Sequence, residues 1–285
     1  MLLVLDIGNT NIHLGVFAGR GEHSTLVRDW RIRTEPRMTA DELALTLDGL
    51  LGEDTDRVVS VAALSTVPSL LRELRVMIPK YFGSGPHVLF EPGLRAGVPL
   101  LVDNPKEVGT DRVANALAAR ETYGTACIVV DLGTTTLVDV VSAKGEFLGG
   151  AIAPGIDIAV DALAERTVTL RTVELLPPRS VVGKNTVEAL QSGILYGFAG
   201  QVDGLVSRVR REVPGFGDDD AVTVVATGYL APLVFDECRT LDVAHPYLTL
   251  EGLRLVFERQ QDIRRRHEAR SQADPDGARR SPVSD

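Results

Sequence analysis

The sequence predicts an α/β protein made of two homologous halves that face each other across a cleft. The first observation is a repeat: residues 2–13 read LLVLDIGNTNIH and residues 128–139 read IVVDLGTTTLVD. In each copy an apolar run ends in an aspartate, followed by one apolar residue, a glycine and small hydroxyl or amide side chains. The second observation is that each copy begins a segment of over a hundred residues in which strand and helix patterns mix.

The repeated unit predicts a buried strand, a tight break and a second strand, which together form a hairpin. Asp6 and Asp131 stand where a strand leaves the core, so a carboxylate there can hold a cation or a water. Gly8 and Gly133 let the backbone approach a phosphate, with turn N–H groups and threonine hydroxyls as donors. A lone motif of this kind is usually a hairpin with a solvated aspartate. Two copies favour two loops that hold opposite sides of a polyphosphate.

The first half continues with strands and helices. Residues 25–33, TLVRDWRIR, alternate apolar and charged side chains, as a half-exposed strand does. Thr39 is the predicted N-cap of a helix with an acidic first turn and an apolar face of leucines between residues 43 and 51. The next predicted elements are a buried strand at residues 58–64, a helix from Pro68 through Met77 and a short strand at residues 87–90.

A chemically distinctive stretch links the halves. Residues 91–99 are rich in glycine and proline and predict a loop, and residues 103–112 lead into a helix of small residues that should pack closely against a neighbour. An Asp-Arg pair at a helix start is often only a stabilising acidic residue beside a surface arginine. Because Gly109 directly precedes the pair and the loop lies between the halves, we expect Asp111 to project into the cleft.

The second half begins with a hairpin at residues 127–141. Residues 148–155, LGGAIAPG, contain three glycines and a proline, which permit close backbone approach to a ligand or to another chain segment. A helix is predicted at residues 156–165, and Thr186 is the predicted cap of a long helix at residues 187–209. Four glycines on that helix, Gly193, Gly197, Gly200 and Gly204, indicate another helix packed very near, in the same chain or across a dimer.

The chain closes with a buried strand at residues 222–225 and a helix from Leu248 to about Arg259. From Gln260 onward apolar residues nearly vanish, which predicts a disordered tail at residues 260–285.

Composition narrows the function classes. The net charge of −9 argues against a general nucleic-acid surface, and 44% hydrophobic residues suit an ordinary globular core. The two cysteines, Cys127 and Cys238, have no metal-type spacing and predict reduced core residues. The apolar run after Met1 is interrupted by Asp6, too early for a signal peptide, and no stretch has transmembrane length. We therefore expect a cytoplasmic protein that contacts neither membrane nor nucleic acid.

Three stretches resemble the nucleotide-contacting elements of the superfamily of acetate and sugar kinases, heat-shock chaperones and actin: residues 6–10, residues 131–135 and Ala226-Thr227-Gly228. Further motifs resemble the type III pantothenate kinases, in the order found there: residues 109–112, 131–135, 149–155, 183–186, 191–193 and 202–204. The resemblance implies two ribonuclease H-like halves, the actin-like ATPase fold, around a central nucleotide cleft. The implied halves span residues 1–118 and 119–259, with the tail at 260–285.

The resemblance also implies residue roles and a homodimer. The first loop would hold the phosphates of ATP and, through Asp6, magnesium: Asp6, Ile7, Gly8, Asn9, Thr10, Asn11, Ile12 and His13. Thr134 would contact the nucleotide from the other side, and Asp131 would help hold a monovalent cation, potassium or ammonium. The implied pantothenate residues are Val102, Gly109, Thr110, Asp111 and Arg112, with Thr186 reaching the pantothenate of the partner subunit.

The chemistry agrees with these residue types. Phosphoryl transfer to an alcohol depends on positioning and charge neutralisation. A carboxylate that takes the proton of the substrate hydroxyl contributes about 100- to 10,000-fold, and Asp111 is the predicted general base.

Three departures from the family pattern leave alternatives open. Val102 stands where a tyrosine is usual, Leu137 where a threonine is usual and Tyr229 where a glycine is usual. One alternative is a catalytically weak homologue that binds nucleotide or pantothenate as a regulator. Another is a kinase whose acceptor is a sugar or a small carboxylate.

Overall fold

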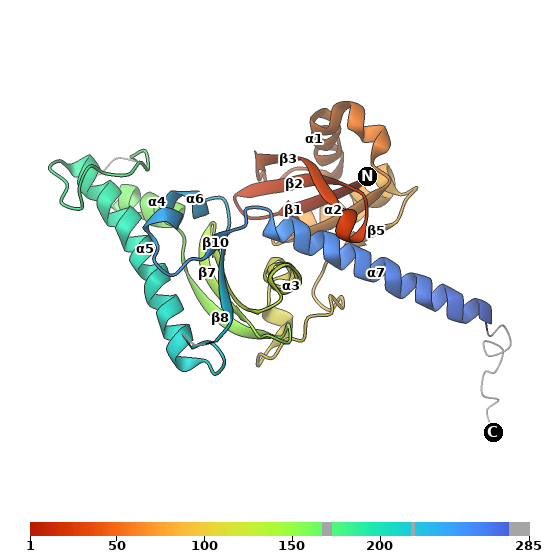
Figure 1. Cartoon of the computed structure of the whole chain (residues 1–285). Coiled ribbons are helices and arrows are strands. Elements are labelled where there is room, and N and C mark those ends of the chain that lie inside the picture. Colours follow the sequence, from red (N-terminus) through yellow and green to blue (C-terminus); the bar gives the residue numbers. More distant parts are fainter. Residues whose placement is uncertain (167–172, 218–219, 274–285) are drawn as a thin grey trace, which may run out of the picture.

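Two sheets of the same topology form the framework of the molecule. The structure is a computed structural model, which describes residues 1–166, 173–217 and 220–273. The first sheet has the order β3-β2-β1-β4-β5, and the second has the matching order β8-β7-β6-β9-β10. In each sheet the first three strands are antiparallel and the last two run parallel to the first. The predicted duplication is therefore confirmed at the level of the fold (Figure 1).

The strands of the first sheet are β1 (Leu2–Ile7), β2 (Asn11–Ala18), β3 (Thr25–Arg33), β4 (Ser60–Ser65) and β5 (His87–Leu89). Those of the second are β6 (Ala126–Leu132), β7 (Thr135–Val141), β8 (Phe147–Pro154), β9 (Val222–Thr227) and β10 (Val243–Ala244). The helices are α1 (Ala40–Leu51), α2 (Pro68–Phe82), α3 (Thr110–Tyr123), α4 (Ile156–Arg166), α5 (Thr186–Glu212), α6 (Ala231–Val234) and α7 (Leu248–Ala273). Short 3₁₀ turns lie at Gly21–His23, Gly52–Arg57, Pro105–Glu107 and Phe235–Glu237.

The central strands of each sheet are buried on both faces, in different cores. In β1, Leu2 and Val4 enter a central core that also contains residues of the second sheet, α3 and α7. Leu3, Leu5 and Ile7 enter an outer core with α1 and α2. The second sheet repeats this pattern, with α4, α5 and α6 at its outer core. Because side chains alternate along a strand, Asp6 in β1 and Asp131 in β6 project toward the space between the sheets.

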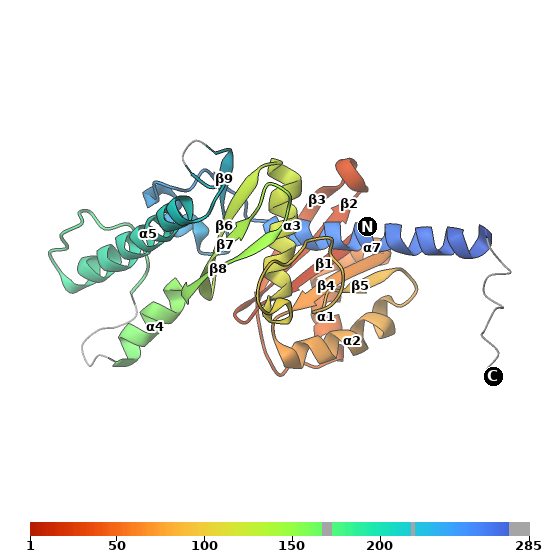
Figure 2. The same ribbon diagram turned by 90° about the horizontal axis from the view of Figure 1, so that it is seen from below.

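Helices α3 and α7 fill that space (Figure 2). They pack very closely, as the small residues of α3 predict, because a Cβ added at Gly252 would lie 2.0 Å from the Ala114 carbonyl oxygen. Since the halves share this central core, the predicted division between residues 118 and 119, which falls within α3, stays a prediction. In the described ranges no helix has the length and apolar character needed to cross a bilayer.

Most local predictions are confirmed, including the N-cap at Thr39. Its side chain accepts a hydrogen bond from the Glu42 backbone N–H, and the Glu42 side chain accepts one from the Thr39 backbone N–H, so a full capping box begins α1.

Two predicted boundaries are wrong. The N-cap of α5 is Asn185, whose Oδ1 accepts a hydrogen bond from the Glu188 backbone at 2.9 Å, so Thr186 is the first helical residue. Helix α7 continues to Ala273 instead of ending near Arg259. Residues 261–273 include no glycine or proline, and Asp262 and Arg265 form an i,i+3 ion pair. Residues 274–285 of the predicted tail lie outside the described residues.

The glycine-rich stretch 148–155 lies largely in strand β8, which the sequence does not reveal. A Cβ added at Gly150 would lie 2.3 Å from the Val138 carbonyl oxygen, and one at Gly155 would lie 2.3 Å from the Thr134 carbonyl oxygen. Of the two open readings for these glycines, close approach of another chain segment is the one that the structure supports at Gly150 and Gly155.

Candidate active site

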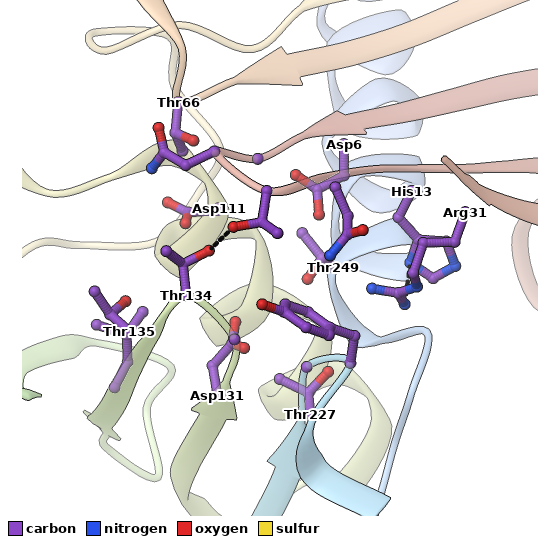
Figure 3. A pocket seen from close by; sticks show the side chains of 18 of the residues that line it. Asp6, His13, Arg31, Thr66, Asp111, Asp131, Thr134, Thr135, Thr227 and Thr249 are labelled. Atoms are coloured by element: carbon purple, nitrogen blue, oxygen red, sulfur yellow. Dashed lines mark hydrogen bonds between the residues drawn. The ribbon is translucent and has the colours of Figure 1, made fainter. Parts of the chain in front are cut away.

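A polar pocket lies between the two sheets at the turns of both repeated hairpins (Figure 3). It encloses about 740 Å³ of free space, part of which is open solvent. Residues of both halves line it, and α3 and α7 contribute Asp111 and Thr249. The predicted cleft is therefore present.

The two repeated loops meet at the pocket. The Thr10 and Thr134 hydroxyls share a hydrogen bond of 2.7 Å, which joins the first hairpin to the second. Thr34 fixes the first loop, because its hydroxyl donates to the Gly8 carbonyl oxygen at 2.7 Å and its N–H donates to the Thr10 carbonyl oxygen at 2.9 Å. Hydroxyl groups of both halves thus meet between two turns whose glycines line the pocket, an arrangement that suits a phosphate.

Three carboxylates from three elements enter the pocket: Asp6 from β1, Asp111 from α3 and Asp131 from β6. Loss of water raises the pKa of Asp6 to about 8, with the Asp111 and Asp131 charges adding to the shift. Loss of water and the Asp111 charge raise the pKa of Asp131 to about 7, and a 3.1 Å hydrogen bond from the Asn115 amide opposes this rise. A bound cation would favour the ionised form of these crowded carboxylates, so the cluster suits a cation site.

One carboxylate oxygen of Asp111 is left without a partner in the pocket. Its Oδ1 is buried and has no hydrogen-bond partner. Burial raises its pKa, and the charge and backbone N–H of Arg112 oppose the rise. A Cβ added at Gly109 would lie 2.3 Å from this oxygen, so a larger residue at position 109 would turn the Asp111 carboxylate away from its present position. Glycine before the Asp-Arg pair therefore leaves the carboxylate free to keep this orientation.

The donor set suits a metal that is shared with a ligand. Among the residues that the structure describes, no three His, Cys, Asp or Glu side chains are arranged to hold a metal ion by themselves. Magnesium is commonly held by one or two carboxylates together with phosphate oxygens and waters. Asp6 beside the two repeated loops fits that manner of binding.

Arg112 lies beside the pocket, between the Asp139 carboxylate and the Phe147 ring. Its guanidinium forms an ion pair with Asp139 of β7, with Nε 3.1 Å from both carboxylate oxygens. The Phe147 ring lies beneath it, 5.2 Å from the guanidinium carbon to the ring centroid. Asp139 is only 1% exposed, so this pair is a buried one.

The structure brings most predicted ATP residues to the pocket but few of the predicted pantothenate residues. Asp6, Gly8, Asn9, Thr10, Asn11, His13 and Thr134 all line it. Ile7 and Ile12 do not, because their side chains are buried in the outer core with α1 and α2. Of the predicted pantothenate residues only Asp111 lines the pocket. Thr110 faces a second cavity under residues 90–100, Val102 packs beside Gly149, and Thr186 begins α5, in the outer part of the second half.

Two of the three departures lie in the pocket wall. Leu137 pairs with Asp131 across the second hairpin, which gives the pocket an apolar wall beside Asp131. The Tyr229 hydroxyl donates to Asp157 of α4 at 2.6 Å, and its ring carbon lies 3.6 Å from where a Gly133 Cβ would stand.

Sequence reasoning missed Arg31 of β3, which also lines the pocket. Its Nη2 donates to Nδ1 of His13 at 3.2 Å, and its guanidinium carbon is 5.7 Å from the centroid of the Tyr229 ring. The one available signal is the alternation of residues 25–33, which shows that the side chains take turns on two faces but not which strand pairs with them.

Comparison with known proteins identifies the family. The profile of the type III pantothenate kinase family matches residues 2–208. The type III pantothenate kinase of Rhodococcus opacus is 64% identical over 283 residues, which cover 99% of this chain and 100% of its own. That of Mycobacterium tuberculosis is 59% identical over 93% of this chain and 97% of its own.

Solved structures support the fold alone. A putative Baf family transcriptional activator from Campylobacter jejuni aligns with a TM-score of 0.56 at 17% identity, over 91% of this chain and 99% of that one. An activator of 2-hydroxyisocaproyl-CoA dehydratase from Clostridium difficile, solved with bound ADPNP, aligns with a TM-score of 0.53 at 12% identity, over 100% and 99%. On the family match and the near full-length identity to its curated members, this chain belongs to the type III pantothenate kinase family.

Proposed function

We propose that this protein transfers the γ-phosphoryl group of ATP to pantothenate and forms 4'-phosphopantothenate, the first step of coenzyme A biosynthesis. The observation that carries the proposal is the unpartnered, buried Oδ1 of Asp111 in a pocket formed by both phosphate-type loops. A kinase that phosphorylates an alcohol needs one carboxylate free to accept a hydroxyl proton beside the phosphate site.

The residues divide the work by position. The loops at Gly8–Thr10 and Gly133–Thr134 hold the phosphate chain from opposite sides, in place of the Thr10 to Thr134 hydrogen bond. Asp111 accepts the proton of the pantothenate hydroxyl. The hydroxyl oxygen of pantothenate bonds to the γ-phosphorus, and the bond between that phosphorus and the bridging oxygen of ADP breaks. The raised pKa of Asp111 brings it closer to the working pH, which favours a general base.

Asp6 and Asp131 would hold the cations. Magnesium bound through Asp6 and the phosphates, with potassium or ammonium beside Asp131, would neutralise the charge that develops on the transferred group. Arg112 would bind the pantothenate from its fixed position beside Asp111.

The second half supports assembly into a homodimer. The four α5 glycines, Gly193, Gly197, Gly200 and Gly204, are exposed and have no heavy atom within 4 Å of an added Cβ. Exposed apolar side chains lie on and beside the same helix, including Val187 at 48%, Val181 at 66% and Val182 at 63%. A second copy packed there would cover this surface and could bring its Thr186 to the pantothenate site, which Thr186 does not line in its own chain.

The test is ADP release by the purified protein with ATP and magnesium, with and without pantothenate, in potassium and then in sodium buffer. We expect release that requires both pantothenate and potassium. The Asp111→Asn variant should bind ATP as the wild type does, with turnover reduced about 100- to 10,000-fold. Asp262→Asn, at an exposed site on α7, is the matched control and should keep full turnover. Full turnover by Asp111→Asn would remove Asp111 from the mechanism.

A nucleotide- or pantothenate-binding regulator is the second candidate, because Tyr229 occupies the pocket wall where the family usually has glycine. A folded protein that binds ATP but releases no ADP with any acceptor would favour it. Release with a sugar or small carboxylate instead would change only the acceptor.

A further inference from the structure

One row of side chains crosses the first sheet into the pocket. Asp6 of β1 pairs with His13 of β2, and His13 pairs with Arg31 of β3. Residues directly opposite each other in antiparallel strands project from the same face. All three therefore face the pocket, and Figure 3 shows His13 and Arg31 together on one side of it, with Asp111 and Thr134 on the other. The equivalent row in the second sheet is Asp131, Leu137 and Ile152, so the charged row belongs to the first half alone.

A chain of hydrogen bonds fixes the histidine. The Tyr247 hydroxyl donates to Asp29 Oδ1 at 3.3 Å, and Asp29 Oδ2 lies 3.3 Å from Nε2 of His13. The other ring nitrogen, Nδ1, lies 3.2 Å from Nη2 of Arg31. A neutral imidazole with its hydrogen on Nε2 satisfies both contacts, because it donates to Asp29 and accepts from Arg31. Burial, and secondarily the Arg31 charge, lower the pKa of His13 to about 4, which keeps it neutral. Both ring nitrogens are thus used, and neither remains for a ligand.

Arg31 itself is largely free. It is exposed, and no carboxylate in the described ranges forms an ion pair with it, in contrast to Arg112, which Asp139 holds. A guanidinium has five N–H donors, and the contact to His13 uses one of them. Among the residues that line the pocket, all of them described, Arg31 is the one lysine or arginine.

The charges around the pocket indicate which ligand the free N–H groups of Arg31 suit. Three carboxylates and a neutral histidine face a site in which the bound nucleotide brings several negative charges. Arg31 already opposes the raised pKa values of Asp6 and Asp131 through its charge. Arginine suits phosphate because its planar fork donates two parallel hydrogen bonds to phosphate oxygens.

We propose that Arg31 binds the phosphate chain of the nucleotide, and that His13 acts as a positioning residue for Arg31 instead of contacting the nucleotide. The proposal rests on the nucleotide pocket of the proposed function, and it assigns a phosphate ligand outside both repeated loops.

The experiment measures nucleotide affinity by calorimetry, with ATP, ADP and adenosine, at fixed magnesium and without pantothenate. In Arg31→Gln we expect ATP and ADP to bind about 10- to 100-fold more weakly and adenosine to bind unchanged, since a charge-assisted hydrogen bond to phosphate is lost. The salt dependence of ATP affinity should also become shallower. Arg28→Gln is the matched control: Arg28 lies on the same strand and is exposed, but it pairs with Asp54 outside the pocket.

A mutant cycle tests the role of His13. His13→Phe should weaken ATP binding less than Arg31→Gln does, and the double variant should bind ATP no more weakly than Arg31→Gln alone, because both changes remove one interaction. Thermal unfolding of each variant shows that it is folded.

Three results would overturn the proposal: unchanged ATP affinity in Arg31→Gln, an equal loss for adenosine, or additive losses in the double variant. None of them depends on turnover. A wild type that binds ATP with this pattern but never phosphorylates pantothenate would refute the proposed activity and support the assignment of Arg31.

Discussion

One edge of the Arg112 guanidinium is bonded to Asp139, and the other edge is open. Its Nε and Nη2 face Asp139, so Nη1 and the second hydrogen of Nη2 remain for a ligand. Gly150 on the neighbouring strand makes room for this pair, since a Cβ there would lie 2.5 Å from Asp139 Oδ1. The buried aspartate therefore fixes which edge of the guanidinium stays open.

Removal of the Asp139 charge should loosen that edge. We expect Asp139→Asn to raise the KM for pantothenate about tenfold, as for loss of one oriented hydrogen bond, with little change in the KM for ATP. The free energy of unfolding should fall by about 2 to 4 kcal/mol, because Arg112 loses its partner in a mostly buried site.

Steady-state kinetics and thermal unfolding measure both effects, with Asp54→Asn as a control in an ion pair whose arginines, Arg28 and Arg57, are exposed. A lower stability with an unchanged KM for pantothenate would show that Asp139 supports only the fold.

At the scale of elements, the sequence predicts what local patterns encode. The two hairpins follow from apolar runs that end at Asp6 and Asp131, and the capping box of α1 follows from Thr39 and Glu42 three residues apart. Strand β8 could not be predicted, because its glycines serve the neighbouring strand β7, whose carbonyl oxygen at Val138 leaves no room for a side chain at Gly150.

The same limit applies to the site. Asp111 could be predicted because its glycine and its helix start are adjacent in sequence. Arg31 could not, because its place depends on pairing with His13 across two strands, and that register is set by the whole sheet. The last turns of α7 were missed because they are polar, so no apolar period marks them, although their residues favour a helix.

Helix α5 gives a test of the proposed dimer. Gly197 is exposed in mid-helix with no neighbouring atom within 4 Å of an added Cβ. In an isolated subunit Gly197→Leu should stabilise the helix by about 0.5 to 1 kcal/mol, because leucine has the higher helix propensity. In a dimer that packs through this face, the added side chain should clash and weaken association.

Light scattering over a range of concentrations measures the mass, and thermal unfolding checks that the variant is folded. We expect the Gly197→Leu protein to dissociate at concentrations where the wild type is dimeric. Gly49→Leu is the matched control, since Gly49 is also an exposed helical glycine with open space around it, in α1. A wild type that is monomeric at all concentrations, or a Gly197→Leu variant as dimeric as the wild type, would place any interface elsewhere.

At the scale of the whole molecule, the fold itself concentrates negative charge. Asp6 comes from the first sheet, Asp131 from the second and Asp111 from the helix between them, so closing the two halves together brings the three carboxylates into one pocket. Burial and mutual repulsion of these carboxylates raise their pKa values, to about 8 for Asp6 and about 7 for Asp131.

The raised pKa values make the stability of the ligand-free protein fall as pH rises. In the unfolded chain both groups lose their protons near pH 4, whereas the folded protein keeps them until about pH 7 to 8. Between these limits the folded state binds more protons, so each group lowers the free energy of unfolding by about 1.4 kcal/mol per pH unit. The stabilising contribution is complete below about pH 4 and is lost once pH passes the folded pKa values.

Thermal unfolding without nucleotide, between about pH 5 and pH 8, measures this slope. We expect the melting temperature to fall across the range, and to fall less in Asp6→Asn and in Asp131→Asn, each of which lacks one titrating group. Asp262→Asn, exposed on α7, should keep the wild-type slope. ATP with magnesium should restore most stability at the upper end of the range, because bound cations favour the ionised carboxylates there. A melting temperature that rises with pH, or a slope identical in all variants, would show that these two carboxylates do not govern the pH dependence of stability.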